Sequence, residues 1–523
     1  MDCFATLAMA EWLTDIHVSC LALPDRIIGM AEEVMRMEHV DVLVVGAGIS
    51  GIGAGYYLQT LCPDRSYAIL EGRPQLGGTW DLFRYPGIRS DSDMYTLGYA
   101  FRPWTEAKSI ADGPNILSYL QRTAADYGID KKIRFNHHVK TAAWSTDDAR
   151  WTVTSDGPDG PVAMTCNFLF MCSGYYNYAK GYAPEFAGAE DFKGRIVHPQ
   201  FWPADLDYTD KNVIVIGSGA TAVTLVPAMA PKTKHITMLQ RSPTYIVARP
   251  GEDAMANWMR GKLPSKMAYG ITRWRNVLLG MLFFKMARNK PAKVKERLIG
   301  MVREELPGHD IETHFTPRYN PWDQRLCLVP DGDLFASIRE GKAEVVTDTI
   351  DRFVPEGIKL ASGNTLPADV IVTATGLELQ LLSDVQFSVD GVAKDLSHTT
   401  NYKGMMYSGM PNMASSFGYT NASWTLKADL TCAYVCRLLN TMKKRGLRQA
   451  TPTPNAPVGE EPFLDFTSGY VTRAMDKFPK QGGRKPWKVH QNYALDLMAL
   501  KFGSVDNEMV FSNPVPKPER KAA

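Results

Sequence analysis

Two stretches of the chain share one pattern of apolar and polar positions. Each begins with a short β-branched run, His39–Val45 (HVDVLVV) and Asn212–Ile216 (NVIVI), which is typical of a buried parallel strand. A glycine-rich turn follows, and then a helical pattern that ends near Leu58 in the first copy and near Met229 in the second. The chain therefore contains the same strand–turn–helix unit twice. This predicts an α/β protein with two Rossmann-like dinucleotide-binding domains.

Further elements are expected around these two units. Residues Ala254–Val302 carry a helical pattern rich in methionine and arginine, without a strand pattern, and this predicts a helical insertion. The other expected elements are strands at Tyr67–Leu70, Trp151–Thr154, Met164–Met171, His235–Leu239, Glu344–Thr347 and Asp369–Thr373, and a helix near Asn115–Tyr127.

Composition and charge exclude several classes of protein. The 523 residues are 45% hydrophobic, which is enough for two or three domains with buried cores. The net charge is only +2, with both signs spread along the chain, and this gives no reason to expect a nucleic-acid partner. The eight cysteines show no C-x-x-C spacing and no disulfide framework, so we expect a cytoplasmic setting and no metal site. No apolar run reaches the ~18 residues of a membrane span.

The two glycine-rich turns have the spacing of loops that hold a pyrophosphate. Gly46–Gly51 (GAGISG) and Gly217–Ala222 (GSGATA) each lie between a predicted strand and a predicted helix. In the first loop Gly46 permits the tight turn, Gly48 lets the backbone approach the phosphates, and Gly51 allows close helix packing. The helix N-terminus then offers free N–H groups and the positive end of its dipole. A purely structural turn is the alternative, and the second copy in the same context disfavours it.

The residue that closes the second strand of each unit separates the two nucleotides. Glu71 stands where a carboxylate accepts a hydrogen bond from a ribose 2′-OH, and Arg241 stands at the equivalent place in the second unit. A carboxylate repels a 2′-phosphate, whereas a guanidinium binds it in a fork. We therefore expect FAD at the first site and NADPH at the second, where Ser242 adds a hydroxyl contact. A solvated surface arginine is the alternative for Arg241.

These assignments give the expected domain organisation. Residues 1–36 are an extension outside the catalytic fold, residues 37–205 and 367–511 are two parts of an FAD-binding domain, residues 206–366 are an NADP-binding domain with a helical insertion at about 254–305, and residues 512–523 are a disordered tail.

Two longer motifs narrow the chemistry. Residues Phe192–Pro203 (FKGRIVHPQFWP) fill every specified position of F-x-G-x-x-x-H-x-x-x-W-[P/D], and Gly77–Asp91 fill those of [A/G]-G-x-W-x-x-x-x-[F/Y]-P-[G/M]-x-x-x-D. In both, the chain resembles the type I Baeyer–Villiger monooxygenases, which are class B flavoprotein monooxygenases. Related flavin monooxygenases share the F-x-G-x-x-x-H core and end in another aromatic residue. The likeness extends over about Met37–Phe511 and is greatest to the mycobacterial FAD-containing monooxygenases that activate the thioamide drug ethionamide.

This resemblance implies an oxidoreductase that uses FAD, NADPH and O2 to insert one oxygen atom by way of a C4a-peroxyflavin. It implies the conversion of ketones to esters or lactones and the oxidation of sulfides and thioamides. We therefore expect a small apolar ketone or sulfur compound as substrate. An N- or S-oxygenating flavin monooxygenase without true ketone activity stays open as an alternative, as does the oligomeric state. A flavin disulfide reductase is disfavoured, because Cys62 stands alone in the region where that class needs a cysteine pair.

The resemblance also implies two catalytic residues. Arg325 matches the active-site arginine of the family, and a permanent cation there would stabilise the peroxide anion and the tetrahedral adduct. Asp91 matches the carboxylate that positions it. An ordinary ion pair in a loop is the alternative for Arg325. Gln324 departs from many relatives, which carry a lysine that contacts the 2′-phosphate, so the preference for NADPH depends more on Arg241.

The remaining site residues are loop positions and positions carried over from the resemblance. Those expected for FAD are Gly46, Gly48, Ser50, Gly51, Glu71, Gly78, Thr79, Trp80, Asp81, Leu82, Asp91 and the backbone of Val139. Those expected for NADPH are Arg89, Ser90, Gly217, Ser218, Gly219, Ala220, Thr221, Ala222, Val223, Thr224, Arg241 and Ser242. The signature residues Phe192, Gly194, His198 and Trp202 imply a linker that couples nucleotide binding to domain rearrangement. For His198 we favour a packed interdomain side chain over a general acid or base.

One apolar segment has an unusual charge context. Residues Trp274–Lys285 (WRNVLLGMLFFK) are apolar and lie among several arginines and lysines, which suits a helix at a lipid surface or one that lines an apolar substrate entrance. We favour an ordinary buried helix over both and keep peripheral membrane contact open. Substrate-pocket residues are expected from the helical region and from Tyr419–Trp424.

Overall fold

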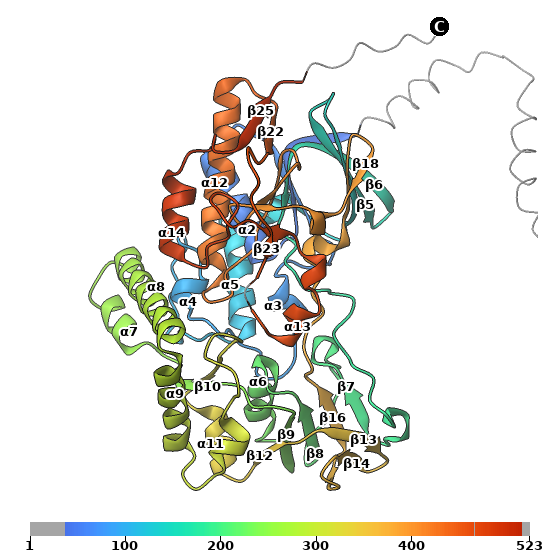
Figure 1. Cartoon of the computed structure of the whole chain (residues 1–523), viewed down its shortest axis with the longest axis vertical. Coiled ribbons are helices and arrows are strands. Elements are labelled where there is room, and N and C mark those ends of the chain that lie inside the picture. Colours follow the sequence, from blue (N-terminus) through green and yellow to red (C-terminus); the bar gives the residue numbers. More distant parts are fainter. Residues whose placement is uncertain (1–36, 465, 515–523) are drawn as a thin grey trace, which may run out of the picture. The chain divides into compact units, whose positions relative to one another are not determined.

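Each strand–turn–helix unit lies in a sheet of its own (Figure 1). The structure is a computed structural model, and it describes residues 37–464 and 466–514. The first sheet has nine strands in the order β18-β17-β4-β5-β6-β1-β2-β3, with β21 paired to β6, and the second has five in the order β12-β9-β8-β16-β7. The α/β architecture with two Rossmann-like units is thereby confirmed. The extension 1–36 and the tail after Pro514 lie outside the described residues.

The first sheet combines a parallel nucleotide-binding part with an antiparallel meander. Strand β1 pairs in parallel with β2, and the helix α2 connects them, while β4, β5 and β6 run antiparallel. Its strands are β1 Glu38–Val45, β2 Tyr67–Leu70, β3 Ile133–Arg134, β4 His138–Ser145, β5 Arg150–Gly157, β6 Gly160–Met171, β17 Gln386–Val389, β18 Val392–Lys394 and β21 Met413–Ser415. The helices associated with this part are α2 Ile49–Leu61, α3 Thr79–Leu82, α4 Met94–Leu97, α5 Gly113–Asp126 and α12 Trp424–Arg445.

The second sheet is parallel throughout. Its strands are β7 Arg195–Val197, β8 Asn212–Ile216, β9 His235–Gln240, β12 Ala343–Thr347 and β16 Val370–Thr373, with the helices α6 Ala220–Met229 and α11 Asp333–Arg339. The strand β7 comes from the F-x-G-x-x-x-H motif, and both β7 and β16 lie within the stretches assigned to the FAD-binding parts. Both strands nevertheless belong to the same sheet as β8 of the second unit, which differs from that assignment. The domain boundaries themselves stay predictions.

Glycine is required where the two loops leave their strands. Gly46 has φ +101°, and a Cβ there would lie 2.7 Å from the carbonyl oxygen of Cys172. Gly217 has φ +137°, and a Cβ there would lie 2.3 Å from the carbonyl oxygen of Ala374. Both positions combine a left-handed backbone with a close approach of a second chain segment, which other residues do not tolerate. The tight turns that the sequence predicts are therefore present in both units.

The helical insertion consists of α7 Ala254–Arg260, α8 Ser265–Asn289 and α9 Pro291–Glu305, followed by α10 Ile311–Phe315.

The structure corrects two expectations from the sequence. The segment 274–285 is not an ordinary buried helix, because Trp274, Leu278 and Leu282 of α8 are each about half exposed. Ser512 is not in a disordered tail, because it ends β25 (Met509–Ser512), which pairs antiparallel with β22 (Gln449–Pro452). Among the described residues, no helix is both long and apolar enough to cross a bilayer.

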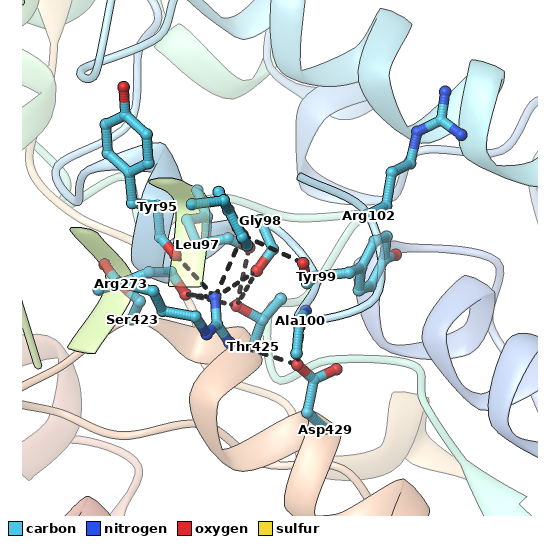
Figure 2. A network of polar contacts seen from close by, with 12 residues as sticks. Tyr95, Leu97, Gly98, Tyr99, Ala100, Arg102, Arg273, Ser423, Thr425 and Asp429 are labelled. Atoms are coloured by element: carbon cyan, nitrogen blue, oxygen red, sulfur yellow. Dashed lines mark hydrogen bonds and ion pairs between the residues drawn. The ribbon is translucent and has the colours of Figure 1, made fainter. Parts of the chain in front are cut away.

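A buried arginine attaches α8 to the first part of the fold (Figure 2). Arg273 donates hydrogen bonds to the carbonyl oxygens of Tyr95 (2.8 Å), Thr96 (3.2 Å) and Gly98 (2.7 Å). These carbonyls belong to the C-terminal end of α4, where the helix dipole favours a cation. Arg273 also pairs with Asp429 of α12 at 3.3 Å. Burial raises the pKa of Asp429 to about 6, although the Arg273 charge opposes this shift.

Gly194, in the F-x-G-x-x-x-H motif, offers a test of how the edge strand β7 packs beside β16. A Cβ there would lie 2.2 Å from the carbonyl oxygen of Asp369, beside the start of β16. We expect Gly194→Ala to lower the free energy of unfolding by about 1–3 kcal/mol, because the sheet edge must shift to admit the methyl group. The control is Gly300→Ala in α9, where no atom lies within 4 Å of an added Cβ. That change should stabilise by about 0.5–1 kcal/mol. Denaturant titration of both variants checks this, and equal midpoints would contradict it.

Candidate active site

A cavity of about 620 Å³ lies where the two glycine loops converge. It is named here the first cavity. From the first unit, Gly46, Gly48, Ile49 and Ser50 line it, and from the second unit Ala220, Thr221 and Thr224. The N-terminal ends of α2 and α6 therefore both face the same space. Two such ends favour negatively charged groups in that space.

The backbone around the loops fits two pyrophosphate groups. The first intrahelical hydrogen bonds run from Ile52 N to Gly48 O in α2 and from Val223 N to Gly219 O in α6, both at 3.1 Å. The N–H groups that precede them are left for a ligand. A Cβ at Gly219 would meet no atom within 4 Å, and one at Gly48 would meet only the Gly78 backbone, at 3.5 Å or more. The loops therefore leave room for phosphate oxygens.

Glu71 is buried beside the first loop and lines the first cavity. Its two carboxylate oxygens accept hydrogen bonds from the backbone N–H of Ala47 (2.7 Å) and of Arg73 (3.0 Å). Burial raises the pKa of Glu71, and these two hydrogen bonds oppose that shift. Each oxygen keeps a further lone pair, so the carboxylate can still accept a ribose hydroxyl.

Arg241 and Ser242 follow β9 directly and are both exposed. The Ser218 hydroxyl donates to the carbonyl oxygen of Ser242 at 3.0 Å, which fixes this segment against the second glycine loop. The Arg241 guanidinium is thus carried on a short segment tied to that loop, but outside the first cavity. This placement suits a 2′-phosphate at the rim, and it equally suits a solvated arginine.

Asp91 and Arg325 form an ion pair, as expected from the resemblance. Arg325 lies just before β11 (Cys327–Pro330), and Asp91 lies between α3 and α4. The Asp91 carboxylate raises the pKa of Arg325 well above its ordinary value, so the guanidinium stays charged. Both side chains line the first cavity and also a second, larger one of about 1330 Å³. The pair therefore stands in the wall that the two cavities share.

The second cavity has the walls that the sequence predicts. Residues 275–286 of α8 line it on one side and residues 420–423 on another. Apolar side chains dominate its lining: Val247, Val277, Leu278, Leu279, Met281, Leu282, Phe283, Phe284, Leu326, Leu328 and Leu426. A cavity of this composition favours an apolar ligand.

The structure brings most, but not all, of the predicted contacts together. The predicted residues that line the first cavity are Gly46, Gly48, Ser50, Glu71, Gly78, Thr79, Trp80, Arg89, Ser90, Asp91, Val139, Ala220, Thr221, Thr224 and Arg325. Those that line neither cavity are Gly51, Asp81, Leu82, Gly217, Ser218, Gly219, Ala222, Val223, Arg241, Ser242, Phe192, Gly194, His198 and Trp202. Asp81 is buried and forms ion pairs with Arg73 (2.5 Å), which lines the first cavity, and with Arg84 (2.7 Å), which does not.

An aromatic wall of the first cavity joins Trp424, from the predicted pocket segment Tyr419–Trp424, to Tyr175 and Tyr176, which the sequence did not predict as site residues. The ring of Tyr175 stacks on that of Trp424 with centroids 5.2 Å apart, and the two hydroxyls of Tyr175 and Tyr176 lie 2.9 Å apart. The Trp424 indole N–H donates to the Ser50 hydroxyl at 2.7 Å, which ties α12 to the start of α2. The run YYNY at 175–178 is the sequence signal for the tyrosine side of this wall, and it does not reveal that Tyr175 stacks on Trp424.

His198 lies away from both cavities. Its Nδ1 accepts a hydrogen bond from the Gln200 backbone N–H at 3.2 Å. The ring packs against Gly181, where a Cβ would lie 2.1 Å from a ring carbon. Burial lowers the pKa of His198. These contacts suit the packed linker histidine that we favour.

Comparison with known proteins places the chain among flavoenzymes. The profile of the Flavin-binding monooxygenase-like family matches residues 108–262, and that of the NAD(P)-binding Rossmann-like domain matches residues 44–119. FAD-containing monooxygenase EthA of Mycobacterium tuberculosis is 57% identical over 474 residues, which cover 90% of this chain and 97% of that protein. The probable FAD-binding monooxygenase AlmA of Acinetobacter baylyi is 46% identical, covering 92% of this chain and 98% of that protein.

Solved structures share the fold at lower identity. An oxidized steroid monooxygenase bound to NADP has a TM-score of 0.72 and 21% identity, covering 91% of this chain and 100% of that chain. OTEMO in complex with FAD and NADP has a TM-score of 0.65 and 23% identity, covering 80% and 88%. In the part of the chain that the structure describes, no cluster of His, Cys, Asp or Glu could hold a metal ion.

The burial of His198 gives a pH test. Because burial lowers its pKa below 6.5, the folded state binds its proton less readily than the unfolded state does. The resulting stability is fully present above pH 6.5 and is lost as the pH falls below that value. We expect His198→Asn to show a smaller loss of melting temperature between about pH 8 and pH 5.5 than the unaltered protein. His309→Asn, which changes an exposed imidazole, should keep the full loss. The same pH slope in all three proteins would contradict this.

Proposed function

Because the chain belongs to the family of FAD-containing monooxygenases that includes EthA, we propose that it inserts one atom of O2 into a small apolar ketone or sulfur compound. The protein is a flavin-dependent monooxygenase, and its cofactors are FAD and NADP. The finer assignment rests on one observation, the Asp91–Arg325 pair in the wall between the first and second cavities.

The residues around the first cavity would hold both nucleotides. The N-terminus of α2 would bind the pyrophosphate of FAD, and Glu71 would bind its ribose. The N-terminus of α6 would bind the pyrophosphate of NADPH, and Arg241 would bind its 2′-phosphate. FAD reduced by NADPH supplies the centre that activates O2. The stacked rings of Tyr175 and Trp424 would exclude water from the inner end of this site.

Arg325 would stabilise the negative charge that develops on the oxygen of a ketone carbonyl. Its charge is permanent, so it gives up no proton during the reaction. Asp91 would hold the guanidinium in place and would also offset the cost of a charge beside a largely apolar cavity. In the net reaction, ketone, O2, NADPH and H⁺ yield ester, NADP⁺ and water.

Sulfur oxidation makes a different demand on this site. A sulfide or thioamide attacks with its own lone pair and builds no oxyanion on the substrate, so it depends less on Arg325. The oxidation of nitrogen or sulfur alone, without ketone activity, is therefore the second candidate, and the response of Arg325 variants separates the two.

The first test compares Arg325→Ala with the unaltered protein on a ketone panel and a sulfide panel. We expect ketone oxygenation to fall by about 10²–10³-fold, because one stabilising donor of the oxyanion is lost. Sulfide oxidation should fall far less. Mass spectrometry measures the products, and NADPH consumption measures coupling. Arg318→Ala removes an exposed arginine from the same region and should leave both rates unchanged. Equal losses on both panels would contradict the proposed role, and sulfide products alone from the unaltered protein would favour the second candidate.

A second test concerns the choice of nucleotide. We expect Arg241→Ala to raise the KM for NADPH by about 10–100-fold and to leave that for NADH nearly unchanged, because only NADPH carries the 2′-phosphate. The control is Lys234→Ala, which removes an exposed cation beside the opposite end of β9. Steady-state kinetics with both nucleotides give the answer. An unchanged ratio of the two KM values would show that Arg241 is a solvated surface arginine that does not bind the 2′-phosphate.

A further inference from the structure

The helix α8 directs an apolar stripe toward solvent. Met267, Ile271, Trp274, Leu278 and Leu282 are each 45% exposed or more. Their spacing of three and four positions places them on one face of the helix. A solvent-facing helical surface is ordinarily polar, and an exposed apolar patch of this kind marks a contact with another apolar phase. These five residues are named here the outer stripe.

The helix cannot turn this stripe inward. On the opposite face Ala268, Tyr269 and Thr272 are buried, and next to them Arg273 is held by three carbonyl oxygens and by Asp429 (Figure 2). Rotation of α8 would remove a buried charge from its partners, which is strongly unfavourable. The exposure of the outer stripe is therefore built into the fold.

Neighbouring helices extend the apolar surface. Met255 and Trp258 of α7 are also more than half exposed. The ring of Trp274 contacts that of Tyr493 at the start of α14 (Tyr493–Leu497), with centroids 5.7 Å apart. Figure 1 shows α7, α8 and α14 along the same side of the protein.

The helical segment that carries the outer stripe is rich in lysine and arginine, although Arg273, Arg275 and Arg288 are paired with Asp429, Asp253 and Asp323. Residues 254–302 contain eleven Lys and Arg and one Glu, although the whole chain has a net charge of only +2. The remainder of the chain is therefore net negative. Lys266 lies beside the first residue of the stripe, Lys285 follows its last residue by three positions, and Lys290 follows the last residue of α8. All three are exposed and form no ion pair within the described residues.

We propose that the outer stripe and its lysines dock this protein on an anionic lipid bilayer. Apolar side chains would enter the headgroup boundary while the lysines contact phosphates, which is the arrangement of interfacial amphipathic helices. A second copy of the chain fits poorly, since a symmetric dimer would bring two basic surfaces together. Lysine is also depleted at protein–protein interfaces.

The second cavity opens beside the same stripe. Leu278 and Leu282 are both exposed and also line that cavity, as do Met281 and Phe284. An apolar substrate dissolved in lipid would thus meet the cavity without crossing water. This consequence rests on the proposed function, whereas the docking does not.

The test is flotation of the full-length, FAD-loaded protein with vesicles of phosphatidylcholine, alone or with about one third phosphatidylglycerol. We expect binding to the anionic vesicles that weakens as salt is raised. The variants Met267→Ser/Ile271→Ser and Lys266→Glu/Lys290→Glu should each lower the partition coefficient by about tenfold or more. Neither pair lines the first or second cavity, so retained flavin absorbance and an unchanged melting temperature report an intact fold.

The matched control is Val392→Ser, which removes an exposed apolar side chain from β18 in the first sheet. It should bind vesicles as the unaltered protein does. No binding to anionic vesicles, or equal binding to neutral and anionic ones, would overturn the proposal. Light scattering measures the oligomeric state of the same variants. If they convert an oligomer to a monomer and leave lipid binding unchanged, the stripe is an interface between copies of the chain and the proposal is overturned.

Discussion

The arrangement of the site depends on the ion pair between Asp91 and Arg325. The two residues come from segments that flank the whole second strand–turn–helix unit, so the pair forms only when both sheets have folded and packed together. A guanidinium beside a largely apolar cavity is costly without a carboxylate partner. The Asp91 carboxylate therefore holds the Arg325 guanidinium in the wall between the first and second cavities.

Local signals account for what the sequence predicts well. A phosphate loop needs a strand, a tight turn and a helix in immediate succession, so the pattern around Gly46 and Gly217 suffices to find it. The buried strand Asn212–Ile216 was predicted with the limits that the structure shows. The Asp91–Arg325 pair, in contrast, is not visible in spacing, and its prediction rests on the resemblance to the family at Asp91 and at Arg325. Sequence position does not determine whether an exposed guanidinium such as that of Arg241 meets a ligand or water.

Features that depend on distant partners were missed. The strand β7 has three residues, two of them exposed, and its own pattern does not reveal that it pairs with β16. The stacking of Tyr175 on Trp424 joins segments with no common pattern. Apolar composition suggested a buried α8, and the error has a physical cause. The buried Arg273 determines which side of the helix faces inward, and a charged residue among apolar ones gives no such hint in a sequence.

The division of the two cavities constrains how the substrate range of such an enzyme can change. Asp91, Ser92, Arg325, Leu328 and Ala422 line both cavities, so a mutation at any of them alters cofactor chemistry and substrate fit together. Val277, Met281 and Phe284 line only the second cavity and lie on one long helix anchored elsewhere by Arg273. Selection can therefore exchange these side chains one at a time and leave the oxygen-activating end untouched. In this architecture, the substrate range can evolve separately from the cofactor chemistry at the α8 positions that line only the second cavity.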